Sequence, residues 1–89
     1  MKFEAREYSS EEIESMNDKY RSKCFSVKYS VDGSCKIKQG KIKNFSDTGI
    51  IFSTTEHDVL VLAYIFNPDF DELSGEEART IEEKLKDSL

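Results

Sequence analysis

Two segments of the sequence carry the pattern of a helix that lies on a surface. In the first, Ser9 is followed three residues later by Glu12, the spacing of a capping box that satisfies backbone donors at a helix start. Apolar residues then recur at helical spacing along one stripe, and polar residues fill the other positions. This stripe consists of Ile13, Met16 and Tyr20. The pattern predicts a helix over about 9–23.

The second helical segment, near the end of the chain, repeats these signals. Ser74 precedes Glu77 by three residues, as a cap precedes its partner. Glu82 and Lys86 stand at the i,i+4 spacing of a helical ion pair, which contributes about 0.3 kcal/mol. The apolar stripe of this segment consists of Ala78, Ile81 and Leu85. We predict a second surface helix over about 75–88.

Between the predicted helices, apolar residues recur at every second position, which is typical of a half-buried strand. The inward positions of the first strand, over 24–31, are Phe25, Val27, Tyr29 and Val31. The chain then turns at an Asp-Gly pair. A two-residue loop would place Val27 opposite Lys38, whereas a three-residue loop over 31–33 places Val27 opposite Ile37. Because the second register matches apolar residues with each other, the three-residue loop is predicted, with its glycine in the left-handed position.

The two cysteines are predicted to be free thiols. The three-residue loop puts Cys24 and Cys35 on opposite faces of the sheet. Their spacing, in a chain with one histidine, also fits no zinc-binding pattern.

The rest of the central segment is predicted to be a meander of bent strands. Ile37 and Ile42 are five residues apart, so the inward face must change phase between them. Gly40 is the expected site of a bulge or bend that divides one long strand into two. A turn at 46–49 and a short strand follow. The uninterrupted apolar run at 59–66 then predicts a central strand that is covered on both faces.

Together these elements predict an α+β, mainly β fold class. We expect a small antiparallel five-stranded barrel or rolled sheet, flanked by an N-terminal and a C-terminal helix. With 89 residues the chain has room for one modest core. Residues 1–89 are therefore predicted to form a single domain, with the β-meander at about 24–66.

Charge and hydropathy narrow the choice of partner and compartment. Charged residues make up 35% of the chain and the formal net charge is -5, which weighs against tight binding to a phosphate backbone. A nucleic-acid partner is therefore not expected, although four lysines gather in the middle of the chain: Lys36, Lys38, Lys41 and Lys43. No apolar run approaches the roughly 20 residues of a membrane span, and the first residues do not resemble a secretory signal. We expect a cytoplasmic protein without membrane insertion.

The candidate catalytic and metal-ligating residues each lack a required neighbour. His57, the single histidine, lies in a polar loop with no nucleophile at a recognisable spacing. The acidic cluster at 69–76 departs from the EF-hand pattern, since Leu73 stands at a ligand position and Ser74 stands where glycine is required. The sequence therefore predicts neither an enzyme nor a metal site.

The corner between two strands at 44–49 is the most informative segment. Asn44 and Ser46 offer polar side chains at a strand end, and Gly49 permits close approach of a ligand or a positive φ. A well-formed turn without a ligand is the other interpretation of these residues. The pattern Asn-x-Ser-x-x-Gly followed by an apolar strand resembles the motif of the PilZ family. The acidic C-terminal helix is also similar to the helix that closes PilZ domains.

The resemblance implies a PilZ-like barrel in which this motif and two arginines, four residues apart before the first strand, bind cyclic di-GMP. In this sequence Lys19 and Lys23 occupy that spacing, with Arg21 between them. Lysine lacks the planar guanidinium that stacks and bonds bidentately. We therefore expect a non-enzymatic binding or regulatory domain that acts through a protein partner, with weak or no cyclic di-GMP binding and no other cofactor. The candidate ligand-binding residues are Lys19, Arg21, Lys23, Asn44, Ser46 and Gly49.

Two alternatives remain open at this point. A helix followed by five bent strands is also the order of Sm-like RNA-binding proteins, and residues 39–45 resemble a segment of the bacterial Sm-like RNA chaperone. This alternative implies a ring oligomer and salt-sensitive binding of single-stranded RNA. The second alternative is an acidic inhibitor protein of the phage type, which mimics nucleic acid and blocks a basic partner. The two acidic helices would supply its surface.

Overall fold

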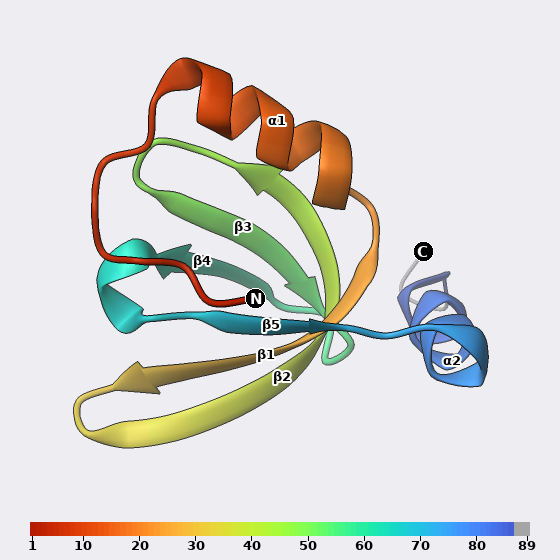
Figure 1. Cartoon of the computed structure of the whole chain (residues 1–89). Helices are drawn as coiled ribbons and strands as arrows, with labels where there is room; N and C mark the ends of the chain where they lie inside the picture. Colours follow the sequence, from red (N-terminus) through yellow and green to blue (C-terminus); the bar gives the residue numbers. More distant parts are fainter. Residues whose placement is uncertain (87–89) are drawn as a thin grey trace.

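The computed structural model describes residues 1–86, in which two helices flank one antiparallel sheet (Figure 1). In chain order the elements are α1 (Ser10–Tyr20), β1 (Cys24–Val31), β2 (Ser34–Phe45), β3 (Gly49–Thr54), β4 (Val59–Ala63), a 3-10 turn (Tyr64–Phe66), β5 (Asp69–Glu72) and α2 (Gly75–Lys86). The strand order is β4-β3-β2-β1-β5. The sheet is rolled but not closed, since β4 and β5 do not pair within the described residues. This arrangement confirms the predicted fold class.

The two helices occupy most of their predicted ranges. In α1, Glu12 N donates to Ser9 Oγ (3.2 Å) and Ser9 N donates to Glu12 Oε1 (3.1 Å), so the predicted capping box is present. The helix ends at Tyr20, earlier than predicted, because Arg21 leaves the helical conformation with a ψ of 136° and Ser22 then adopts a left-handed φ of 67°. α2 buries Ile81 of its predicted stripe. The remainder of its predicted range, after Lys86, lies outside the described residues.

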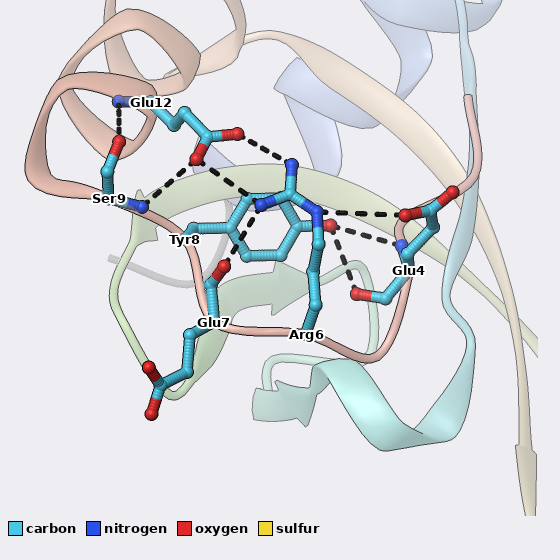
Figure 2. A network of polar contacts seen from close by, with 6 residues as sticks. All are labelled: Glu4, Arg6, Glu7, Tyr8, Ser9 and Glu12. Carbon is cyan, nitrogen blue, oxygen red and sulfur yellow. Dashed lines mark hydrogen bonds and ion pairs between the residues drawn. The ribbon is translucent and has the colours of Figure 1, made fainter.

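Polar contacts around Arg6 tie the segment before α1 to the helix (Figure 2). Arg6 Nη2 lies 2.6 Å from Glu12 Oε2, and the guanidinium carbon lies 4.0 Å from the centroid of the Tyr8 ring. The hydrogen bond from Arg6, followed by the one from the Ser9 backbone, lowers the pKa of Glu12 to about 2. These contacts set the path of the N-terminal segment, which carries Phe3 into the core.

Aromatic side chains fill the space that the rolled sheet encloses. The ring centroid of Phe70, in β5, lies 5.7 Å from the centroids of Phe25 and Phe52. The alternation predicted for β1 is confirmed, since Val27 and Tyr29 are buried beside Phe25. Other buried members of this core are Phe3, Ile42, Phe45, Ile50, Leu62 and Tyr64. The core therefore joins residues from every strand and from the N-terminal segment.

The hairpin between β1 and β2 corrects the predicted register. Val27 pairs with Lys38, and the loop contains the two residues Asp32 and Gly33, with φ of 49° and 78°. Positive φ at both positions is the type I′ turn, whose twist matches that of the flanking strands. The prediction was wrong because it assumed that Ile37 faces the core. Ile37 is 60% exposed, and the hairpin of β1 and β2 extends away from the helices (Figure 1).

The observed register also corrects the placement of the cysteines. Ser30 lies on the same face of β1 as Cys24 and pairs with Cys35, so both cysteines are on one face, not on opposite faces as predicted. They lie at opposite ends of the hairpin, and both are free thiols, as predicted. Cys24 is buried, with its Sγ 3.6 Å from the carbonyl oxygen of Ala78 in α2. Burial raises the pKa of Cys24.

β2 is one continuous strand, and its bulge is not at Gly40 as predicted. The register with β3 shifts between Ile42 and Asn44. No change of phase is needed before Ile42, because Ile37 faces outward. Gly40 instead permits close approach of β3, since a Cβ at this position would lie 1.8 Å from the carbonyl oxygen of Ser53.

The run predicted as a central strand lies at the edge of the sheet. Among the described residues, β4 pairs with β3 alone, and residues 64–66 form the 3-10 turn instead of continuing the strand. Leu62 points into the core and is buried, whereas Val61 points outward and is 66% exposed. β5 takes the opposite edge and was not predicted, because its single inward residue, Phe70, stands among acidic residues.

Candidate functional site

The predicted corner at 44–49 is a closed turn whose polar groups bond to each other. Ser46 N donates to the carbonyl oxygen of Gly49 (2.8 Å), and Gly49 N donates to Ser46 Oγ (3.2 Å). The Ser46 hydroxyl donates to the same Gly49 carbonyl oxygen (3.0 Å). The Tyr64 hydroxyl donates to the carbonyl oxygen of Ser46 (2.8 Å), and burial is the main cause that raises the pKa of Tyr64 to about 12. Ser46 therefore serves the turn itself.

Gly49 and Asn44, the other two motif residues, belong to strand pairs. A Cβ at Gly49 would lie 2.5 Å from the carbonyl oxygen of Leu62, so glycine is required for β3 to approach β4. Asn44 is half-buried and pairs with Ile51 directly after the bulge. The motif thus coincides with the tight packing of three strands.

Asn17 of α1 is a residue at this corner that the sequence analysis missed. Its Nδ2 donates to the carbonyl oxygen of Phe45 (3.2 Å), and its Oδ1 accepts from Phe45 N (2.8 Å). Both backbone groups at the end of β2 are satisfied by one side chain. An asparagine on the polar part of an amphipathic helix has no sequence signal that distinguishes it from a solvated residue.

Of the three cationic residues predicted to bind a ligand, Lys19 lies in the last turn of α1, and Arg21 and Lys23 lie in the connection from α1 to β1. Lys19 Nζ is 6.0 Å from the centroid of the Tyr20 ring, and Lys23 is exposed. Arg21 lines a groove on the outer face of the sheet and also a hollow that it shares with Asp47 of the corner. Of the three, Arg21 therefore joins the corner to a larger concave surface.

The groove has a volume of about 560 Å³ and lies between α2 and the β3–β4 turn. Its floor follows a row across three strands, in which Ser53 of β3 pairs with Lys41 of β2 on one side and Val59 of β4 on the other. The remaining lining includes Arg21, Ser22, Lys43, His57, Asp58 and Leu85. One end of the groove is thus basic and the other end is continuous with the edge strand.

Cations outnumber anions in the groove lining. Arg21, Lys41 and Lys43 contribute positive charge, and Asp58 contributes negative charge. Lys41 Nζ lies 3.1 Å from Glu82 Oε1 of α2, which balances one of the cations. Lys41 and Lys43, two of the four lysines in the middle of the chain, therefore line a concave site.

The turn at the end of the groove is built around Thr54. Its Oγ1 accepts hydrogen bonds from Glu56 N and Asp58 N, both at 3.2 Å. His57 is exposed in this turn with a φ of 69°, which confirms its predicted position in a surface loop. Lys38 Nζ, on β2, lies 2.9 Å from Glu56 Oε2 of this turn.

Beside the groove, β4 presents an exposed apolar surface. Val59 is 59% exposed and Val61 is 66% exposed, on the outer face, while Leu62 is buried on the inner face. Ile65, in the following turn, is 70% exposed. The sequence has no charged residue at 59–66. The hydropathy pattern showed the apolar run but not its exposure.

Within residues 1–86, no three histidine, cysteine or acidic side chains are grouped so that they could hold a metal ion. In the same part of the chain, no helix is long and apolar enough to cross a membrane. A comparison with protein-family models, curated proteins and solved structures finds no match to the chain. Inference about function therefore rests on the geometry of the corner, the groove and the edge strand.

Proposed function

We propose that this chain is a non-enzymatic, PilZ-like binding domain that acts through a protein partner, with weak or no binding of cyclic di-GMP. In this proposal the partner binds at the outer edge of β4. The observation that carries it is the exposure of Val59 and Val61 on a strand that, within residues 1–86, pairs on one side only.

Folded proteins seldom leave the edge of a sheet open. An unpaired edge is a template for another strand, and proteins normally guard it with charged residues, proline or a covering segment. β4 has no charge or proline between Val59 and Ala63, in a chain of which 35% is charged. An exposed apolar patch of this kind marks an interaction site.

Weak binding of cyclic di-GMP is supported by the state of the motif residues. The amide and hydroxyl of Ser46 both bond to Gly49, so a ligand would have to replace bonds that form the turn. Lys19 and Lys23 supply point charges and not the planar fork that binds a guanine or a phosphate bidentately.

Calorimetric titration of the full chain with cyclic di-GMP is expected to give no saturable heat at micromolar ligand. Lys23→Ala, which alters an exposed side chain, is the matched variant, because it preserves the turn while removing a candidate cation. Tight binding to the wild type that is abolished by Lys23→Ala or Ser46→Ala would overturn the weak-affinity part of the proposal.

The protein-binding part is tested by capture from a lysate of the source organism with two matched baits. Val61→Lys places a charge on the β4 edge, and Ile37→Lys makes the same change at a similarly exposed site on the hairpin. We expect at least one protein to be retained by the wild type and Ile37→Lys and to fall by about tenfold or more with Val61→Lys, because a charged residue on an edge strand disfavours its pairing with another strand. Equal capture by all three baits, measured by quantitative mass spectrometry, contradicts this assignment.

A further inference from the structure

We propose that the strand which pairs with β4 is β4 of a second copy of this chain, so that two copies form a two-fold symmetric dimer with one continuous sheet. The inference rests on the proposed function in one respect, since it takes the β4 edge as the binding surface.

The N-terminal segment covers one edge of the sheet, at β5, and leaves the other edge, at β4, unpaired within the described part of the chain. This difference favours a two-fold symmetric pair over a head-to-tail ring. The segment Met1–Phe3 lies along the outer edge of β5 (Figure 1). Phe70 N donates to the carbonyl oxygen of Met1 (2.8 Å), and Phe3 N donates to that of Pro68 (3.1 Å). A head-to-tail ring would pair the β4 edge of one copy with the β5 edge of the next, which this segment occupies. Pairing of β4 with β4 requires the free edge alone.

The alternation of side chains in β4 restricts the register of such a pair. Opposite residues of antiparallel strands lie on the same face, so an outward residue must meet an outward residue. With Val61 opposite the same residue of the second copy, Val59 meets Ala63 and Leu60 meets Leu62. All five residues of the strand then lie in apolar pairs.

Two neighbouring registers also keep outward residues opposite outward residues, but each gives a poorer match of apolar residues. A two-fold axis at Leu60 brings Asp58 opposite Leu62, which places a carboxylate in an apolar pair. An axis at Leu62 brings Leu60 opposite Tyr64, where the chain has already left the strand for the 3-10 turn. The axis at Val61 therefore gives the longest apolar match.

Electrostatics supplies an independent signature of this interface. The strand itself is uncharged, whereas each copy carries a formal net charge of -5. The copies therefore repel each other at long range, and salt screens that repulsion. An interface of this kind tightens as salt is added, whereas one held by ion pairs loosens.

Analytical ultracentrifugation of the full chain from micromolar to millimolar protein tests the inference. We expect a monomer–dimer equilibrium that tightens with salt. Val61→Lys is expected to raise the dimer dissociation constant by about tenfold or more, because two lysines face each other at the axis. Ile37→Lys adds the same charge elsewhere and is expected to change it by about twofold at most.

Hydrogen exchange of the wild type at low and high concentration gives a second readout that needs no variant. Amides of β4 that face away from β3 are expected to gain protection as the dimer forms. A monomer at every concentration, a trimer or larger ring, or a dimer that Ile37→Lys weakens more than Val61→Lys would each overturn the inference. A monomer whose Val61→Lys variant still loses a different captured protein would overturn the dimer alone and leave the proposed function standing.

Discussion

Replacing Gly40 with alanine is expected to lower the free energy of unfolding by more than about 4 kcal/mol, which is most of the stability of a small domain. Gly40 pairs with Thr54, and both residues are buried where β2 meets β3. A Cβ at this position would lie 1.8 Å from the carbonyl oxygen of Ser53, 2.8 Å from its carbonyl carbon and 2.9 Å from the Cα of Thr54. All three are backbone atoms of a paired strand, so the clash cannot be relieved by a change of rotamer. Urea denaturation followed by circular dichroism measures the loss.

Gly33→Ala is the matched control for this prediction. Gly33 has a φ of +78°, and a Cβ there would meet nothing within 4 Å. Its substitution is therefore expected to cost only the strain of a left-handed alanine, about 1 kcal/mol. If Gly40→Ala were no less stable than Gly33→Ala, close approach of β3 would not be the reason for glycine at position 40.

The contrast between these two glycines also shows which parts of the fold could be predicted from sequence. The capping box at Ser9 and the alternation through Phe25, Val27 and Tyr29 are local signals, and both are confirmed. The position of the bulge is not local, because it depends on how β2 aligns with β3. Gly40 was expected to bend the strand, whereas it lies in a regular pair and permits a close contact.

The lateral order of the strands could not be predicted for the same physical reason. A run of apolar residues at 59–66 has equal hydropathy whether it lies in the centre or at the edge of a sheet. The interior positions of the sheet are occupied by β3, β2 and β1, and the β5 strand at 69–72 completes the sheet next to β1. The β5 segment has acidic residues around one phenylalanine, which is a pattern typical of a solvated loop. It forms a strand because it pairs with β1, and the sequence does not show that pairing.

At the candidate site, the turn was predictable and its bonding was not. Asn-x-Ser-x-x-Gly identifies a strand corner, and residues 46–49 do join β2 to β3. Whether Ser46 bonds to a ligand or to Gly49 depends on distances that a sequence does not contain. The groove is still harder to predict from the sequence, because its residues Arg21, Lys41 and Val59 come from three separate parts of the chain.

Truncation of Phe70 to alanine is expected to cost about 3–5 kcal/mol, the range for a fully buried phenylalanine. Phe70 is 1% exposed, and its ring is within 6 Å of three other rings, with centroids at 5.7 Å for Phe25 and Phe52 and 5.8 Å for Phe3. These rings belong to β1, β3 and the N-terminal segment, so no single neighbour can collapse into the cavity. Ile65→Ala, at a side chain that is 70% exposed, is the control and is expected to change stability by about 0.5 kcal/mol at most.

The loss of stability in Phe70→Ala is expected to affect β5 and the N-terminal segment before the rest of the sheet. β5 contributes one buried aromatic side chain and pairs over four residues with β1, so Phe70 is its main anchor. Native-state hydrogen exchange of Phe70→Ala should therefore show early loss of protection at the amides of Phe3 and position 70, before those of β2 and β3. That opening would uncover the second edge of the sheet. Uniform loss of protection would contradict this prediction. It would mean that β5 and the N-terminal segment that pairs with it open only when the whole domain unfolds.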